Sequence, residues 1–327
     1  VLNPNRSDRL RAVFSGMKKT QFTFVRRPVD GLLLLDKPQG MTSNQALQKV
    51  RNLFRAEKAG HTGALDPLAT GVLPICLGEA TKVAGILLGN DKAYEVSVAL
   101  GTTTDTDDAD GQVLRQRPIG SYTCEQLDAL LPQFTGDIMQ VPPVYSALKQ
   151  GGEPMYLKAR RGDVIDLPAR PVRIHHIELL TLDPAQFSLR VICGSGTYIR
   201  SLIRDLGEAL GCGAHVTALR RLWVEPFQNI PLRTLDGLQA LAEQGLPELD
   251  AVLHPVAEAL VAVPRLVLDD DQARRVGMGQ KIRIPEPFAA SERVQLCNVA
   301  GLPLGLAGIS ADGHLTVQRL FRWAAIN

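Results

Sequence analysis

Residues 59–82 constrain the fold of this 327-residue chain more than any other segment, because they combine turn-forming residues with an apolar composition. The segment reads AGHTGALDPLATGVLPICLGEATK and contains four glycines and two prolines. Surface loops with so many turn formers are usually polar, since their backbone groups face water. We therefore expect a loop that is packed into the protein and holds a few polar side chains in fixed positions.

Strand patterns occur on both sides of this segment. Residues 31–36 are a short apolar run, while residues 94–100 and 187–193 alternate apolar and polar side chains with period two. The first pattern is typical of a buried strand and the alternation of half-buried strands. These strands are far apart in the sequence, which favours an α/β (α+β) fold with a central mixed, mostly antiparallel sheet flanked by helices.

Helical periodicity appears twice. Thr42 or Ser43 can cap a first helix, whose apolar stripe runs over residues 46–53. A second helix follows the turn at residues 194–196, and Gly211 is well placed to end it.

The chain length suggests two domains, at roughly 150 residues each. Beyond residue 260, short alternating runs separated by glycines indicate a small all-β module. We expect a basic N-terminal arm at 1–28, a catalytic domain at 29–258 and a β-rich domain at 259–327. The arm carries most of the charge asymmetry, since residues 1–27 contain seven Lys and Arg against one Asp. Such an arm is compatible with a polyanionic partner and equally with a solvated tail.

Composition excludes several classes of protein. Apolar residues make up 45% and charged residues 21%, as in globular chains, and no apolar run approaches the roughly 18 residues of a membrane span. Five scattered cysteines without a CxxC pair argue against a disulfide framework and a zinc site. With no signal-peptide pattern, we expect a soluble, cytoplasmic protein and no membrane partner.

Familiar cofactor and metal motifs are missing. The sequence has neither a GxxxxGK[ST] phosphate loop nor HExxH, and Ile199 replaces the third glycine of a dinucleotide fingerprint. The acidic run at 105–111 resembles a calcium loop, but its sixth position is Asp110 rather than glycine. We expect that run to be a turn-forming, solvated loop, while a role in positioning RNA or the adjacent strand stays open. We expect no cofactor and no metal.

A set of motifs resembles the pseudouridine synthases, and most closely the bacterial tRNA pseudouridine-55 synthase family. The main match is HTGALDPLATG at residues 61–71. The others follow in family order: LDKPQGM at 35–41, DKAY at 91–94, YSALK at 145–149, GTYIR at 196–200, GCGAHV at 211–216 and LRRL at 219–222. The resemblance implies an isomerase that converts uridine to pseudouridine at position 55, in the TΨC loop of tRNA, without a cofactor.

The reaction moves a base from an N-glycosidic to a C-glycosidic bond, which requires an ionised carboxylate at the anomeric carbon or at an adjacent proton. The resemblance assigns that role to Asp66 as nucleophile. A buried carboxylate needs a partner to stay ionised, and the resemblance supplies Arg200 as its ion pair. Whether Asp66 attacks the sugar or stabilises an elimination stays open at this stage.

The resemblance also implies how the base is handled. The target uridine lies inside a folded RNA loop and must be flipped out before it can react. Tyr94 would stack on the base, Tyr198 would lie beside the ribose as a candidate general base, and His61 would occupy the vacated place. Leu219 would contact the base.

Phosphate contacts should position the RNA without reading its sequence. We expect them from Lys and Arg side chains in or near the matching motifs: Lys37, Lys82, Lys149, Arg160, Arg161, Arg220 and Arg221. The β-rich domain resembles an RNA-associating PUA-like domain that would reach toward the acceptor end of tRNA. We expect the protein to act as a monomer.

Two other readings of the same residues remain. A non-catalytic RNA binder would bind the loop without exchanging the proton on C5 of uridine. A nucleoside or glycoside hydrolase would release free uracil, and it needs a second acid that residues 59–82 do not obviously offer, since Glu79 resembles a structural residue.

Overall fold

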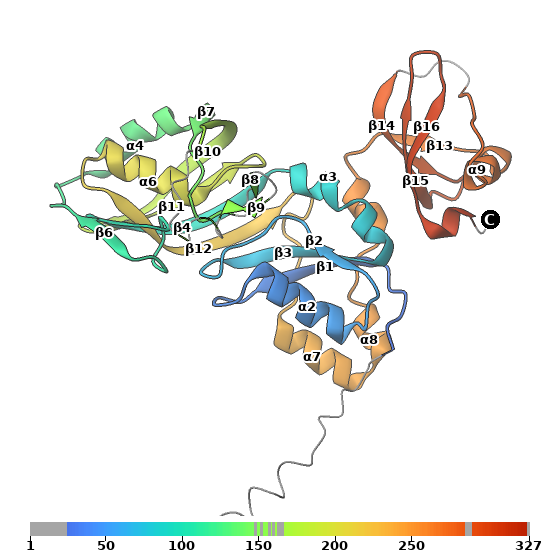
Figure 1. Ribbon diagram of the computed structural model, residues 1–327, viewed down its shortest axis with the longest axis horizontal. Coiled ribbons are helices and arrows are strands. Elements are labelled where there is room, and N and C mark those ends of the chain that lie inside the picture. The colour runs from blue at the N-terminus through green and yellow to red at the C-terminus, as the bar shows by residue number, and fades with distance from the viewer. Residues whose placement is uncertain are drawn as a thin grey trace, which may run out of the picture.

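Two β-sheets organise the protein (Figure 1). The computed structural model describes residues 25–146, 149–150, 153–155, 158, 161, 167–284 and 290–325. Most of the basic arm, residues 1–24, therefore lies outside the described residues. Within the described part, no helix has both the length and the apolar composition needed to cross a bilayer.

The larger sheet has eight strands. In chain order they are β1 (Gly31–Lys37), β2 (Ala59–His61), β3 (Thr70–Leu77), β4 (Lys92–Leu100), β7 (Gly136–Gln140), β10 (Arg170–Asp183), β11 (Gln186–Cys193) and β12 (Ala214–Val224). Across the sheet the order is β1-β3-β12-β4-β11-β10-β7, with β2 paired to β3. Only the β12–β3 pair is parallel, which confirms the predicted mixed, mostly antiparallel sheet.

Helices flank this sheet and short elements connect it. The helices are α2 (Ser43–Leu53), α3 (Ala84–Gly89), α4 (Cys124–Leu130), α6 (Ile199–Ala209), α7 (Leu235–Gln244) and α8 (Leu246–Asp250). The short strands are β5 (Thr102–Thr104), β6 (Val113–Gln116), β8 (Lys149–Gln150) and β9 (Glu153–Pro154), and the 3-10 turns are η1 (Gly78–Lys82), η2 (Leu131–Phe134) and η3 (Val256–Leu260).

The predicted periodicities explain how two helices meet the sheet. Thr42 caps α2 in a capping box with Gln45, so the first of the two proposed caps is confirmed. Helix α6 begins directly after the turn at residues 194–196, and its apolar stripe packs in one core with the inward side chains of β4. Gly211 has a φ of +83° just beyond the end of α6, as expected for a helix stop.

The smaller sheet, β13-β14-β15-β16, forms the C-terminal part of the chain. Its elements are β13 (Arg265–Val267), α9 (Asp270–Gly277), β14 (Ser291–Cys297), β15 (Pro303–Ile309), β16 (Leu315–Leu320) and η4 (Arg322–Ala325). The Lys82 ammonium binds the Leu320 carbonyl oxygen at 2.7 Å, and the Arg322 backbone N–H donates to Glu79 at 2.8 Å. These bonds and a shared apolar cluster attach the small domain to the body beside β1.

Gly71 lies within the short parallel pair of β3 and β12. It pairs with Arg221 of β12, its φ is +97°, and a Cβ at this position would overlap the Arg221 carbonyl oxygen. Gly40 has a similar φ of +77°, but a Cβ there would meet nothing within 4 Å. Substituting each glycine in turn therefore separates the effect of steric overlap with the neighbouring strand, which applies at Gly71, from the effect of a positive φ, which applies at both positions.

We expect Gly71→Ala to lower the free energy of unfolding by about 3 kcal/mol or more, because positive φ and steric overlap both oppose it. Gly40→Ala should lower it by only about 1 kcal/mol, since it meets the conformational penalty alone. Denaturant unfolding of both variants measures the difference. Equal losses would show that strand contact at Gly71 is not tight.

Candidate active site

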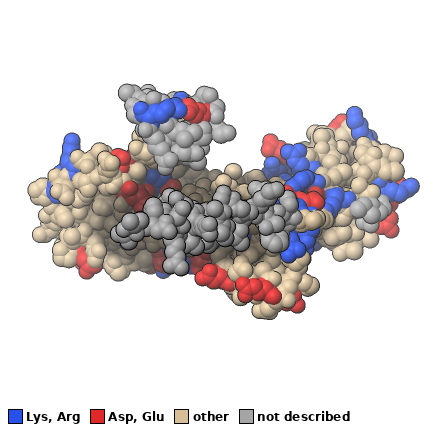
Figure 2. All heavy atoms as spheres, turned by 60° about the horizontal axis from the view of Figure 1, so that its bottom comes forward, with Lys and Arg blue, Asp and Glu red and all other residues tan. Residues whose placement is uncertain are grey.

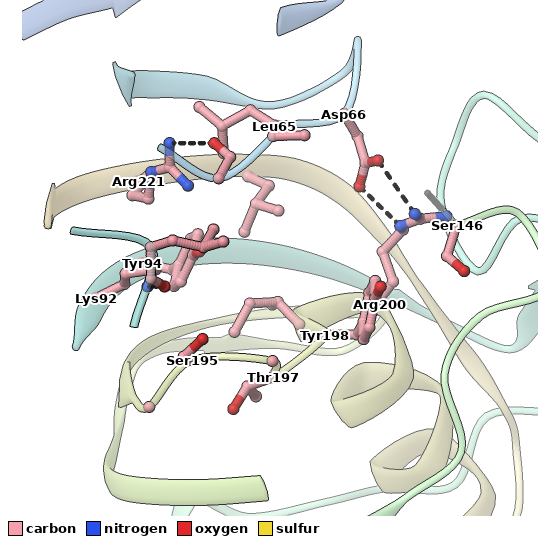
Figure 3. A pocket seen from close by; sticks show the side chains of 17 residues that line it. Leu65, Asp66, Lys92, Tyr94, Ser146, Ser195, Thr197, Tyr198, Arg200 and Arg221 are labelled. Atoms are coloured by element: carbon pink, nitrogen blue, oxygen red, sulfur yellow. Dashed lines mark hydrogen bonds and ion pairs between the residues drawn. The ribbon is translucent and has the colours of Figure 1, made fainter. Parts of the chain in front are cut away.

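Five of the residues predicted to act on the base and sugar line one cavity of about 250 Å³. They are Asp66, Tyr94, Tyr198, Arg200 and Leu219. They come from the loop after β2, from β4, from the start of α6 and from β12, which Figure 3 shows converging on the same space. The cavity is a little smaller than a typical ligand pocket, and a single nucleoside is a group of suitable size.

The loop that carries Asp66 is packed into the protein, as its composition predicts. The Ser43 hydroxyl accepts a hydrogen bond from the Leu65 N–H at 2.7 Å and donates one to the Leu65 carbonyl oxygen at 3.0 Å. Ala69 donates its N–H to the Asp66 carbonyl oxygen at 3.1 Å. With Leu65 and Ala69 buried, these bonds hold the backbone on both sides of the carboxylate.

Arg221 forms hydrogen bonds with the backbone on both sides of this loop. Its Nε donates to the Val72 carbonyl oxygen at 2.7 Å, and its Nη2 donates to the Gly63 carbonyl oxygen at 3.2 Å. The Arg221 side chain is fully buried. It is therefore a structural clamp and not a phosphate contact, which corrects the prediction made for it.

Asp66 and Arg200 form the predicted ion pair (Figure 3). Nη2 of Arg200 donates to Oδ1 of Asp66 at 3.1 Å, and Nε lies 2.9 Å from Oδ2, outside hydrogen-bond geometry. Arg200 is only 5% exposed, whereas the Asp66 side chain is 40% exposed. The guanidinium thus lies within the protein and the carboxylate at the mouth of the cavity.

Arg200 is held by further acceptors. It donates to the carbonyl oxygens of Thr106 at 2.8 Å and Tyr145 at 3.0 Å, and its Nη1 lies 3.6 Å from the Asp108 carboxylate. The acidic run at 105–111 forms the expected turn, with Asp110 exposed, but its Asp108 is buried and bridges to Val216 of β12, which agrees with the alternative that the run positions an adjacent strand. Asp107 of the same run pairs with Arg204 at 3.0 Å. The run supports two arginines of α6.

Partial burial and neighbouring charges together set the protonation of Asp66. Loss of hydration raises the pKa of this carboxyl above its ordinary value, Arg200 lowers it, and the nearby charge of Asp108 raises it again. The net shift is upward. Arg200 therefore limits a rise that burial would otherwise make larger, and ionisation of Asp66 depends on that contact.

The two tyrosines are fixed differently. Tyr94 is buried on β4, and burial raises its pKa while the Arg221 charge lowers it. Tyr198 is half-buried at the start of α6, and its backbone N–H donates to Oε1 of Gln140 at 2.8 Å. Burial also raises the pKa of Tyr198, so its phenol carries its proton at neutral pH. Leu219 is buried on β12, against the same cavity.

Three other predicted residues do not line the cavity. His61 is half-buried on β2, its Nδ1 has no hydrogen-bond partner within the described part of the chain, and burial lowers its pKa. Lys37 is fully buried and donates to the carbonyl oxygens of Pro38 at 2.8 Å and Met41 at 2.7 Å. The phosphate contact predicted for Lys37 is therefore wrong. Lys149 lies in β8, and the structure describes only its backbone.

The remaining basic candidates that the structure describes have protein partners. Lys82 pairs with Glu79 at 2.6 Å, Arg220 with Asp36 at 2.9 Å, and Arg161 with Glu153. Arg160 lies outside the described residues. Lys82 is therefore part of the attachment between the two sheets, while Arg161 and Arg220 keep about half of their side chains exposed.

Comparison with known proteins gives matches along almost the whole chain. Residues 51–199 match the N-terminal domain of the TruB family of pseudouridylate synthases, residues 200–261 match the tRNA pseudouridylate synthase B C-terminal domain, and residues 264–321 match the C-terminal domain of pseudouridine synthase II TruB. These are three consecutive parts of one kind of protein.

Relatives and solved structures agree with this assignment. Proteins named tRNA pseudouridine synthase B are 55% identical in Xanthomonas campestris, over 90% of this chain and 95% of theirs, and 54% identical in Xylella fastidiosa, over 90% and 97%. A "Cbf5-Nop10-Gar1 Complex" is similar with a TM-score of 0.70 and 26% identity, covering 89% of this chain and 84% of that one. An "H/ACA RNP bound to a substrate RNA containing 2'-deoxyuridine" has a TM-score of 0.69 and 25% identity, with the same coverage. The chain belongs to the TruB family of pseudouridylate synthases.

Proposed function

We propose that this protein is an isomerase that converts uridine to pseudouridine in tRNA, at position 55 of the TΨC loop, with Asp66 as its nucleophile. The observation that carries the proposal is the carboxylate of Asp66 at the mouth of a nucleoside-sized cavity, paired with a buried Arg200. Family membership and relatives named tRNA pseudouridine synthase B support the same chemistry. The neighbour bound to a substrate RNA supports RNA as the substrate.

The geometry suits a reaction at the sugar. The bond between N1 of uracil and C1′ of ribose must break, and a bond from C5 to C1′ must form. A carboxylate at the cavity mouth can serve in two ways: it attacks C1′ to form a glycosyl ester, or it stabilises an elimination across the sugar. Both ways require Asp66 to be ionised, which the contact with Arg200 favours.

The size of the cavity requires the target nucleotide to leave the RNA stack, because a folded loop cannot enter a space of about 250 Å³. We assign the stacking surface to Tyr94 and an apolar contact to Leu219, which both line the cavity. We assign to Tyr198, which lines the cavity with Asp66, a position beside the ribose. We assign to His61, on β2 just before the Asp66 loop, the role of filling the position that the base leaves.

The domain organisation, location and oligomeric state of the protein are proposed as well. We assign residues 1–28 to a basic arm, 29–258 to the catalytic domain and 259–327 to a PUA-like domain that contacts RNA, with Lys149 among the phosphate contacts. The separate four-stranded sheet with its own apolar core supports this division, and Figure 2 shows Lys and Arg side chains gathered on and beside the small domain. We place the protein in the cytoplasm, as a monomer without a cofactor, where its five free cysteines would stay reduced.

Asp66→Asn should abolish release of tritium from a TΨC stem-loop labelled at C5 of the target uridine, because the amide can neither attack C1′ nor carry negative charge. RNA affinity should stay within about one order of magnitude, since phosphate contacts dominate binding. Asp137→Asn is the matched control, because Asp137 forms an exposed pair with Arg173. Nucleoside analysis of the product separates the alternatives.

Tritium release that persists in Asp66→Asn would remove Asp66 from the mechanism. Wild-type protein that binds the stem-loop without releasing tritium would be an RNA binder, and free uracil among the products would identify a hydrolase.

Activity should fall on the acid side as Asp66 becomes protonated, at a pH above the ordinary carboxyl range because its pKa is raised. Arg200 lowers that pKa, so Arg200→Met should move the acid limb to higher pH by about one unit or more. Arg200→Lys retains the charge and should leave the limb closer to wild type while lowering the rate. The measurement is the single-turnover rate as a function of pH; an unmoved limb in Arg200→Met would contradict the electrostatic role.

Tyr198→Phe keeps the ring and removes the hydroxyl. If Tyr198 transfers a proton, the single-turnover rate of tritium release should fall by about 10²–10⁴-fold, while RNA affinity is retained. Because the wild-type phenol is protonated at neutral pH, the wild-type rate should also rise toward alkaline pH. A wild-type rate in Tyr198→Phe would limit Tyr198 to packing beside the ribose.

A further inference from the structure

Besides the Asp66–Arg200 ion pair, the cavity contains two cations, Lys92 and Arg221, that the chemistry at Asp66 does not use. Lys92 is the first residue of β4, and Arg221 of β12 lies opposite Tyr94 in the register of the two strands. Both side chains line the cavity, and both are almost fully buried. Figure 3 shows them with Tyr94 on one side of the space, while Asp66 and Arg200 lie on the other.

The two cations are close to each other. A Cβ added to Gly63 would meet Nη1 of Arg221 at 3.7 Å and Cε of Lys92 at 3.9 Å. Like charges repel more strongly where water is excluded than they do in bulk solvent. Burial, and after it the charge of Arg221, lowers the pKa of Lys92 to about 8, so its ammonium still predominates at pH 7.

No carboxylate of the described residues forms an ion pair with either cation. Asp91, the neighbour of Lys92 in the sequence, pairs instead with His175 at 2.9 Å. Buried charges are normally paired, because an isolated one loses its hydration without compensation. The missing anion points to a negative charge that arrives with the substrate or develops on it.

Lys92 also retains a hydrogen-bond donor. An ammonium has three N–H groups, and two of them are used by the carbonyl oxygens of Leu88, at 3.1 Å, and of Asn90. For the third, no acceptor is recorded among the residues that the structure describes. A donor fixed at its base by two backbone carbonyls is well suited to bind an oxygen atom in the cavity.

We propose that Lys92, supported by Arg221, binds the uracil ring and stabilises the negative charge that the ring acquires when the glycosidic bond breaks. This inference rests on the proposed function. When the N1–C1′ bond breaks, its electron pair stays on the ring and is shared by N1, O2 and O4. A pair from C5 then forms the C5–C1′ bond, C5 loses its proton and N1 gains one, so the balance is that of an isomerisation.

The position of Lys92 and Arg221 in the cavity supports the uracil base, rather than a phosphate, as their partner. Lys92 and Arg221 lie with Tyr94, to which we assign the stacking surface for the base, and away from the Asp66 carboxylate that acts on the sugar. Preorganised donors that face developing charge in a buried site contribute strongly to the rate of a reaction.

Lys92→Met tests the charge while keeping the length of the side chain. With saturating C5-tritiated stem-loop, we expect its single-turnover rate to fall by about 100-fold or more, as when one donor to a developing anion is lost. RNA affinity should change by no more than about threefold, since phosphate contacts elsewhere determine it. Lys92→Arg should recover part of the rate, and Lys49→Met, on the exposed side of α2, should equal wild type.

A second substrate distinguishes charge stabilisation from structural damage. Fluorine at C5 withdraws electrons, so 5-fluorouracil is a better leaving group and needs less help from a cation. We expect the deficit of Lys92→Met to shrink by about tenfold on a stem-loop with 5-fluorouridine at the target, measured as loss of that nucleoside after nuclease digestion.

Equal deficits on both substrates would assign Lys92 a structural role and overturn the inference. Weaker RNA binding with an unchanged rate at saturation would identify a phosphate contact instead, and a wild-type rate and affinity would show that the charge has no part in the reaction. If wild-type protein itself releases no tritium, the proposed function fails and this inference fails with it.

Discussion

The buried guanidinium of Arg200 is the interaction on which the site depends. It binds the Asp66 carboxylate, the carbonyl oxygens of Thr106 and Tyr145, and lies near Asp108, so it joins three segments that are far apart in the sequence. Its charge is shared between a carboxylate at the cavity mouth and one in the interior. Because a buried arginine cannot lose its proton, this arrangement keeps a positive charge beside both carboxylates.

Burial affects the charged groups of the cavity in opposite directions, and the result is chemically useful. It raises the pKa of Asp66 and lowers the pKa of Lys92 to about 8, so each group is closer to neutrality than it would be in water. A group whose pKa lies close to the working pH changes its protonation state readily when a charge develops nearby, and such groups are typical of functional sites. The low local dielectric also strengthens each interaction with a bound nucleotide.

The sequence predicted the strands and helices better than the partners of the charged side chains. Alternation in residues 94–100 and helical spacing after residue 196 correctly identified β4 and α6, because burial on one face leaves a periodic signal. The Asp66–Arg200 pair spans 134 residues and has no such signal, so only the resemblance to a family found it. Lys37 and Arg221 were wrongly assigned to phosphates, since a basic side chain carries no local sign of whether its partners are backbone carbonyls.

Sheet topology explains why these groups meet at all. Strand β12 lies between β3 and β4, so Arg221 is opposite Gly71 on one side and Tyr94 on the other. The same residue's side chain binds Val72 and Gly63, at the two ends of the Asp66 loop. One strand therefore positions the loop with the carboxylate and also forms the wall that faces the base. A shift of β12 by one residue would move Arg221 to the other face of the sheet. Both the Asp66 loop and the cavity wall would then lose the contacts that Arg221 provides.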